Sequence, residues 1–116
     1  MITPTIKKRI LPSSRLKKRY VAFEVISNSM LDAQNIQKAI KHTLAGFKAN
    51  KDSNVAFIEK KFNESKKRGI VRIAPRYVSP LISILQAIKN IQDHKVTIQS
   101  IGMSGSLKKA YQKYIV

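Results

Sequence analysis

The strongest constraint on the fold is the alternation of residue types between Arg19 and Ser27 (RYVAFEVIS). One set of alternate positions is entirely apolar, whereas the other mixes apolar and polar side chains. The two sets are Val21, Phe23 and Val25, and Tyr20, Ala22, Glu24 and Ile26. A period of two residues is typical of a β-strand with one face packed against a core. We therefore expect a sheet with a buried face.

Helical and strand-like segments alternate along the rest of the chain. Ser29 and Asp32 resemble a capping box before an apolar stripe with helical spacing, and Ser79 with Pro80 predict the cap and first turn of a second helix. The predicted order is strand, helix, strand, strand, helix, strand, over residues 19–27, 29–50, 55–62, 68–74, 79–91 and 96–101. A glycine-containing turn and a short basic helix close the chain.

This order matches the split βαβ arrangement of a ferredoxin-like fold. The predicted fold class is α+β: a ferredoxin-like (RRM-like) sandwich with an antiparallel four-stranded sheet, two helices on one face and a short C-terminal helix. The 116 residues are enough for one domain. We assign residues 19–116 to it. Residues 1–18 have no regular periodicity and are rich in bases, so we expect a flexible basic arm.

The charge balance points to a polyanionic partner. Lys and Arg number 23 against 6 Asp and Glu, which leaves a formal net charge of +17. A compact domain this basic repels itself unless a polyanion neutralises it. A membrane surface fits less well, because the bases spread over the whole chain and Trp is absent. We therefore expect a nucleic-acid partner, no membrane contact and a cytoplasmic location.

The basic residues form four groups, which we predict to contact RNA phosphates. The groups are Lys7, Lys8 and Arg9; Arg15, Lys17, Lys18 and Arg19; Lys66, Lys67 and Arg68 with Arg72 and Arg76; and Lys108, Lys109 and Lys113. Any one group alone is typical of a solvated surface. Acidic residues are so few that we expect at least two of the groups to contact RNA.

Residues able to perform chemistry are scattered. The six acidic residues do not converge in the sequence, and the two histidines stand alone, so we predict no catalytic residue and no metal site. An RNA recognition motif stacks bases on aromatic residues of its third strand. Here Ile70, Val71 and Ile73 occupy that stretch. We therefore expect RNA contact through phosphates, with little reading of bases.

Several segments resemble protein component 2 of ribonuclease P, the archaeal and eukaryotic family that assists the catalytic RNA in removing the 5′ leader of precursor tRNA. They are Arg19–Ile26 (RYVAFEVI), Gly69–Arg72, Arg76–Val78 and Gly102–Ala110 (GMSGSLKKA). The last is the most specific, since the family ends its last strand with a similar Gly-x-Ser-Gly-Thr-x-Lys run. Here Ser106 stands where Thr is usual.

The turn in this last motif is a predicted phosphate-binding turn. Its residues are Gly102, Ser104, Gly105 and Ser106. Glycines allow a tight turn, either serine can cap the following helix, and Lys108 and Lys109 stand in the first helical turn. A capped helix that only packs on the sheet fits these residues equally well.

The resemblance implies partners for the chain and leaves the chemistry to the RNA. The implied partners are ribonuclease P RNA, protein component 3 and other protein subunits, with precursor tRNA contacted indirectly. Mg²⁺ is expected at the RNA, and no cofactor is expected on the chain. Candidates for a protein interface are the side chains of Ile115 and Val116, which we expect to be exposed, and whichever of Tyr111 and Tyr114 is not buried. The alternative is a general structured-RNA-binding or ribosome-associated protein of the same fold.

Overall fold

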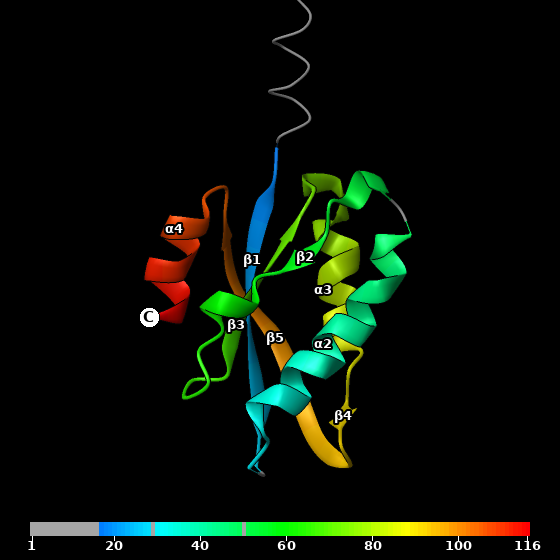
Figure 1. The fold of residues 1–116 in the computed structure, drawn as a ribbon, viewed down its shortest axis with the longest axis vertical. Coiled ribbons are helices and arrows are strands. Elements are labelled where there is room, and N and C mark those ends of the chain that lie inside the picture. The colour runs from blue at the N-terminus through cyan, green and yellow to red at the C-terminus, as the bar shows by residue number, and fades with distance from the viewer. Residues whose placement is uncertain (1–16, 29, 50) are drawn as a thin grey trace, which may run out of the picture.

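The computed structural model describes residues 17–28, 30–49 and 51–116 (Figure 1). The strands are β1 (Arg19–Ser27), β2 (Ala56–Phe57), β3 (Arg68–Ile73), β4 (Asn90–Ile91) and β5 (His94–Ser104). The helices are α2 (Ala33–Lys48), α3 (Val78–Gln86) and α4 (Leu107–Ala110), with short 3₁₀ turns at Lys51–Ser53, Glu59–Lys61 and Pro75–Tyr77 and a π-helical turn at Tyr111–Ile115. Apart from its last two residues, the predicted arm lies outside the described residues.

The strands form one antiparallel sheet in the order β2-β3-β1-β5-β4. The central strand β1 pairs with β3 on one side and with β5 on the other. Without β4, this is the arrangement of a ferredoxin-like fold, so the predicted fold class is confirmed. The sheet has five strands instead of the predicted four.

The additional strand comes from a tight hairpin between β4 and β5. Gln92 and Asp93 both have positive φ, 51° and 67°, which is what a type I′ hairpin turn requires. The turn pairs Ile91 with His94, so β5 begins two residues before the predicted start. The prediction of a helix reaching Ile91 was wrong, because α3 ends at Gln86 and Ile91 enters the core from β4.

The strand predicted over residues 55–62 is also mostly absent. Only Ala56 and Phe57 form strand pairs with β3, and the N–H of Ile58 donates one further hydrogen bond to the carbonyl of Ile70. A 3₁₀ turn at Glu59–Lys61 interrupts the pairing, and a bridge between Asn63 and Arg68 closes the hairpin beyond it. This turn lets both Phe57 and Phe62 pack against the core, with their ring centroids 6.2 Å apart.

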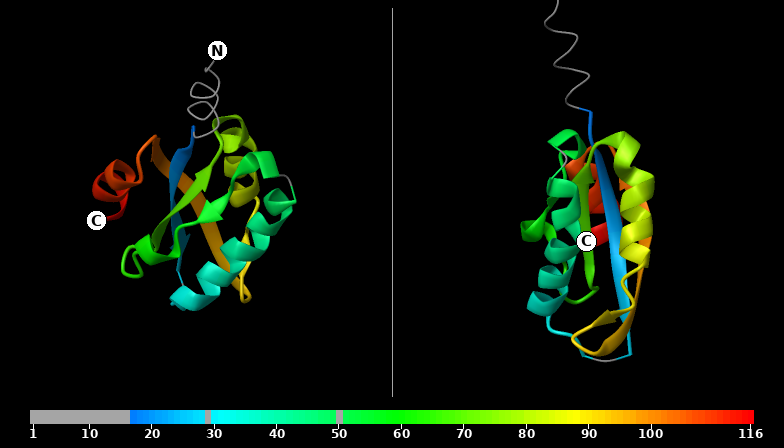
Figure 2. Two further views of the ribbon diagram at one scale, coloured as in Figure 1. Left: turned by 45° about the horizontal axis from the view of Figure 1, so that its top comes forward. Right: turned by 90° about the vertical axis from the view of Figure 1, so that its right-hand side faces the viewer.

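Helices α2 and α3 lie side by side on one face of the sheet (Figure 2). The N-cap of α2 is Asp32, whose carboxylate accepts a hydrogen bond from the N–H of Gln34 (3.3 Å). The predicted cap Ser29 lies outside the described residues. Ser79 was predicted to cap α3, but the 3₁₀ turn before α3 leads directly into the helix, and Ser79 lies in its first turn.

This face carries the main core. Apolar side chains from β1, β3 and β5 meet the inward stripes of α2 and α3, as the two periodicities in the sequence predict. Its buried residues are Val21, Phe23, Val25, Leu31, Ile36, Ile40, Leu44, Phe47, Val71, Ile73, Leu81, Leu85, Ile91, Val96 and Ile98. Each fully buried side chain of this size contributes about 1.5–3 kcal/mol.

The opposite face is partly covered by the C-terminal helix, which consists of α4 and the π-helical turn that follows it (Figures 1 and 2). A small second core lies beneath it, built from Ala22, Ile70, Ala110 and Ile115. Ile115, predicted to be exposed at a protein interface, is fully buried, whereas Val116 is 64% exposed. The interface prediction was therefore wrong for Ile115, because the C-terminal helix turns that side chain onto the sheet.

Gly102 lies in β5 directly beneath the C-terminal helix. A Cβ atom on this residue would collide with the ring of Tyr114, so the helix can approach this closely only over glycine. Next to it, β5 carries a bulge. Ala22 faces Gly102 while Phe23 faces Ser100, which leaves Ile101 as the extra residue. A bulge increases the local twist, and it curls this end of β5 toward the C-terminal helix.

Candidate nucleic-acid interface

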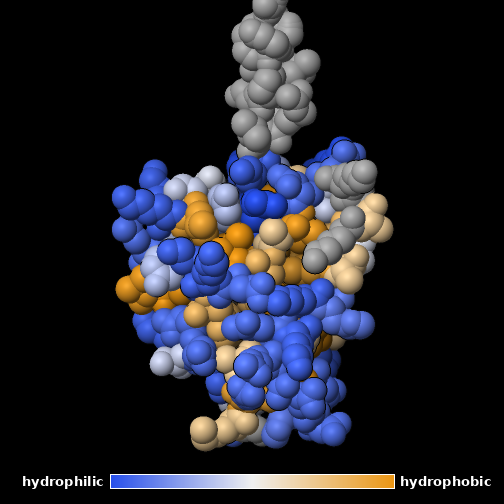
Figure 3. All heavy atoms as spheres, in the orientation of Figure 1, coloured by the Kyte–Doolittle hydropathy of each residue, from blue (hydrophilic) through white to orange (hydrophobic). Residues whose placement is uncertain are grey.

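Two predicted basic groups meet where β1 begins and β5 ends. Tyr20 on β1 faces Ser104 on β5, so the bases preceding Tyr20 lie beside the turn that leads into α4. The guanidinium Nη1 of Arg19 lies 3.9 Å from the position of a Cβ atom on Gly105. We call this set the strand-end cluster: Lys17, Lys18, Arg19, Lys108 and Lys109. Figure 3 shows a hydrophilic surface at this end of the sheet.

The turn between β5 and α4 is held by its serines. The Oγ atom of Ser106 accepts a hydrogen bond from the N–H of Lys109 (3.4 Å), and the N–H of Ser106 donates to Oγ of Ser104 (3.2 Å). Ser106 is therefore the N-cap of α4, and it is one of the two serines that were predicted to cap this helix. Phosphate binding by this turn stays a prediction.

The glycines of the motif work differently from the prediction. Among the described residues no glycine has a positive φ. Gly102 is not part of a tight turn, because it lies within β5 and makes room for Tyr114. Gly105 does lie in the turn, beside Arg19, but a Cβ atom there would make only an ordinary van der Waals contact with that side chain.

The strand-end cluster has no acidic partner among the described residues. The ion pairs recorded there join Lys41 to Glu59, Arg68 to Glu24 (3.0 Å) and Arg76 to Asp52 (3.1 Å). None involves the strand-end cluster. Its positive charge is therefore available to an external anion.

Arg72 and Arg76 lie at the same end of the sheet but are tied to neighbouring residues. Arg72 donates from Nε to the main-chain oxygen of Asn54 (3.2 Å) and from Nη2 to its Oδ1 atom (3.3 Å). Arg76 donates to the carboxylate of Asp52 and lies over the ring of Tyr77. These arginines flank the strand-end cluster, with part of their donor capacity already used.

The bases before β3 have a different environment, at the other end of that strand. Arg68 donates to Glu24 (3.0 Å) and to the main-chain oxygen of Tyr114 (3.1 Å). Lys66 donates to the main-chain oxygen of Val116 (3.0 Å). We call Lys66, Lys67 and Arg68 the hairpin cluster. Two of its three members hold the end of the C-terminal helix.

Asn63 completes this attachment, and sequence reasoning missed it. Its Nδ2 atom donates to the main-chain oxygen of Ile115 (2.9 Å). Three successive carbonyl groups, those of residues 114 to 116, thus each receive a side-chain donor from the hairpin before β3. Lys113 points elsewhere, with Nζ 5.6 Å from the ring centroid of Tyr114.

Other predictions concern residues or groups that lie apart from these clusters. Lys7, Lys8, Arg9 and Arg15 lie outside the described residues. In the part of the chain that the structure describes, no three His, Cys, Asp or Glu side chains are grouped to hold a metal ion. Within the same residues, no helix has both the length and the apolar character needed to cross a bilayer.

Comparison with known proteins places this domain in a family. The model described as the Rpp14/Pop5 family matches residues 19–115. Ribonuclease P protein component 2 of Methanosarcina mazei is 32% identical over 93% of this chain and 92% of its own length. The proteins of the same name from Thermococcus kodakarensis and Pyrococcus furiosus are each 31% identical, over 93% of this chain and 91% of their own lengths.

A solved structure is similar in fold. A chain in the cryo-EM structure of yeast ribonuclease MRP superposes with a TM-score of 0.54 at 13% sequence identity, over 78% of this chain and 76% of that chain. At this identity the likeness concerns the fold alone. The family match, by contrast, runs from the first residue of β1 to the buried Ile115 and includes the turn capped by Ser106. The chain belongs to the Rpp14/Pop5 family.

Proposed function

We propose that this chain is a protein subunit of ribonuclease P and that it binds the catalytic RNA through the strand-end cluster. The observation that carries the proposal is the family match over the whole folded domain, with relatives named ribonuclease P protein component 2. The strand-end cluster supports an RNA partner, because unpaired lysines and arginines release condensed counterions when they contact phosphates.

In this proposal the chain contributes binding, and the RNA contributes the chemistry. Magnesium ions at the RNA would supply the hydrolysis that removes the 5′ leader of precursor tRNA. The strand-end cluster would neutralise phosphates where RNA segments approach each other, and so lower the electrostatic cost of the active RNA conformation. Precursor tRNA would be affected indirectly, and the complex would act in the cytoplasm.

Protein partners belong to the same proposal, with protein component 3 and further subunits as the expected partners. The outer side of the C-terminal helix supports a protein contact, because Leu107, Tyr111 and Val116 line a shallow depression there. Lys61 also lines this depression, with its Nζ atom 4.6 Å from the ring centroid of Tyr111. Figure 3 shows hydrophobic residues exposed over this helix. Exposed apolar patches rimmed by polar residues are typical of protein interfaces.

Reconstitution tests this function. Precursor-tRNA cleavage would be measured with the cognate RNA and partner proteins, with and without this chain, across a range of magnesium concentrations. We expect the chain to raise the cleavage rate and to lower the magnesium requirement. An unchanged rate in the complete mixture would overturn the proposal.

The RNA that copurifies with the chain separates this function from general RNA binding. A tagged chain isolated from cell extract is expected to carry the ribonuclease P RNA. Recovery of ribosomal RNA without ribonuclease P RNA would instead favour a ribosome-associated protein of the same fold. Cleavage by the purified chain alone would contradict the proposal that the chain contributes binding and the RNA performs the hydrolysis.

A further inference from the structure

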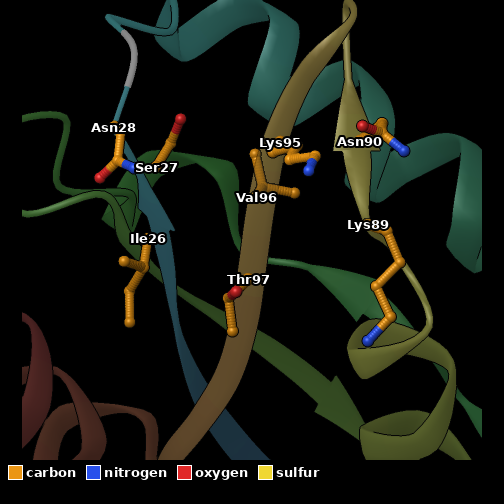
Figure 4. Close-up of a pocket in the computed structure, with 8 residues that line it drawn as sticks. All are labelled: Ile26, Ser27, Asn28, Lys89, Asn90, Lys95, Val96 and Thr97. Atoms are coloured by element: carbon orange, nitrogen blue, oxygen red, sulfur yellow. The ribbon is translucent and has the colours of Figure 1, made fainter.

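A second basic surface lies on the half of the sheet that the C-terminal helix leaves uncovered. A groove of about 380 Å³ runs there between the end of β1 and the β4–β5 hairpin. We call it the β4–β5 groove. Figure 4 shows its lining, which is Ile26, Ser27, Asn28, Lys89, Asn90, Lys95, Val96 and Thr97.

Strand pairing places four of these side chains on one face. Ile26 faces Thr97 and Asn90 faces Lys95 across adjacent strands, and Asn28 and Lys89 line the groove from just outside β1 and β4. Their neighbours Val25, Ile91 and Val96 are buried against α2 and α3, so this set points to the opposite face. The C-terminal helix packs farther along the same face, over Ala22, Ile70 and Ile101, and does not reach it.

The groove combines positive charge with groups that can contact bases. Lys89 and Lys95 are exposed, no acidic residue lines the groove, and neither lysine forms an ion pair in the described part of the chain. The nearest acid in sequence, Asp93, stands at the hairpin tip outside the lining. Ile26 is 45% exposed and gives an apolar surface beside two asparagines and a threonine.

We infer that the β4–β5 groove binds an unpaired RNA strand, with Lys89 and Lys95 on its phosphates. This rests on the proposed function, since it takes the RNA partner from there. Two lysines without acids complement a phosphodiester backbone, and a single strand can turn its bases toward an apolar and hydrogen-bonding floor. A duplex keeps the Watson–Crick edges of its bases paired inward and therefore offers such a floor fewer groups to contact.

The groove is distinct from the strand-end cluster. The two surfaces lie at opposite ends of β1, and the nine residues from Arg19 to Ser27 span about 26 Å. One RNA helix end and one unpaired segment can therefore bind at the same time. The chain would act as a spacer that fixes the distance between two parts of the RNA.

The test compares K89Q/K95Q with the charge-matched control K38Q/K60Q, whose lysines are also exposed but lie outside both surfaces. Binding of the cognate ribonuclease P RNA is measured from about 0.05 to 0.3 M salt. Each single-strand phosphate contact contributes a slope of about 0.7 in log K against log salt, so we expect K89Q/K95Q to lower the slope by about 1.4. At about 0.15 M salt this corresponds to roughly a tenfold loss of affinity. The control should keep the wild-type slope.

A photoreactive residue at Thr97 identifies the occupant in the reconstituted complex. We expect crosslinks to unpaired nucleotides of the RNA. Crosslinks to a protein subunit, or a K89Q/K95Q slope equal to that of K38Q/K60Q, would overturn the inference while leaving the proposed function intact. If the wild-type chain binds no ribonuclease P RNA at all, both the inference and the proposed function are overturned.

Discussion

The hairpin cluster and the strand-end cluster have similar composition and opposite environments. In the hairpin cluster, Lys66 and Arg68 donate to the last carbonyl groups of the C-terminal helix, and Arg68 also pairs with Glu24. In the strand-end cluster, no member has an acidic partner among the described residues. A run of bases in the sequence therefore does not reveal its role, because partners elsewhere in the chain decide whether the charge is used internally.

The two environments have opposite effects on stability. The last carbonyl groups of any helix lack partners within it. The part-buried hydrogen bond from Arg68 contributes about 1.5–3 kcal/mol, and the exposed one from Lys66 at most about 1 kcal/mol. The hairpin cluster thus stabilises the fold. Uncompensated charges at the strand-end cluster repel one another and slightly destabilise the compact state. Their gathering at one end of the sheet is explained by a ligand more readily than by folding.

Neutralising the strand-end cluster should give the largest effect in RNA binding. In K17Q/K18Q/R19Q three phosphate contacts disappear, so the slope of log K against log salt should fall by about 2–3. Affinity at about 0.15 M salt should fall on the order of a hundredfold. Because these side chains make no ion pair in the described structure, the midpoint of urea unfolding should not decrease.

The matched control for this variant is K38Q/K41Q/K60Q, which removes the same charge from α2 and the segment before β3. Lys41 pairs with Glu59 at the surface, which contributes at most about 1 kcal/mol. We expect a salt slope close to that of the wild type. Equal slopes for the two triple variants would show that only net charge matters and would remove the distinction between the clusters.

Removing Arg68 should have the next largest effect, and on stability alone. R68M breaks the contacts to Glu24 and to the Tyr114 carbonyl. Glu24, whose side chain is 22% exposed, then keeps the hydrogen bond from Gln99 but loses its cation. We expect a loss of about 2–3 kcal/mol in urea unfolding. The variant E24Q/R68M should recover part of this loss, because it no longer leaves the Glu24 carboxylate without its cation. A change in the RNA salt slope as large as one phosphate contact would place Arg68 at the RNA instead.

The packing of the C-terminal helix on β5 can be disturbed without replacing a charged residue. In G102A the new methyl group collides with the ring of Tyr114, and overpacking of this kind costs about 2 kcal/mol. The same substitution in a Y114A background should cost much less, since the colliding ring is gone. An equal cost in both backgrounds, measured by urea unfolding, would show that Gly102 serves β5 itself and not the helix above it.

Sequence periodicity correctly predicted those elements whose apolar pattern repeats over many residues. β1 and α2 are such elements, and the structure confirms both. The errors fall where a few residues change the backbone direction. The positive φ values of Gln92 and Asp93 create β4, and the 3₁₀ turn at Glu59–Lys61 shortens β2. Neither segment contains the glycine that usually marks a tight turn.

For the candidate site, the sequence likewise did not show which groups each basic side chain contacts in the folded chain. The sequence identified the bases of the strand-end cluster, since the motif from Gly102 to Ala110 and the run before Tyr20 are both basic. It did not separate them from the hairpin cluster, because Glu24 lies 44 residues from Arg68 and the Tyr114 carbonyl 46. Lys89 and Lys95 were missed because they are isolated in the sequence and meet only through the β4–β5 hairpin.

Ser106 offers the finest test, because it lies among the strand-end bases but caps α4. Its Oγ atom already accepts the N–H of Lys109, so S106A should cost about 1 kcal/mol of stability and leave the salt slope of RNA binding unchanged. S106T, which keeps a capping hydroxyl, should restore most of that stability. If S106A lowers both RNA affinity and the salt slope while S106T restores them, the hydroxyl helps to hold a phosphate. The turn would then join the strand-end cluster as a binding element, in contrast to the hairpin cluster.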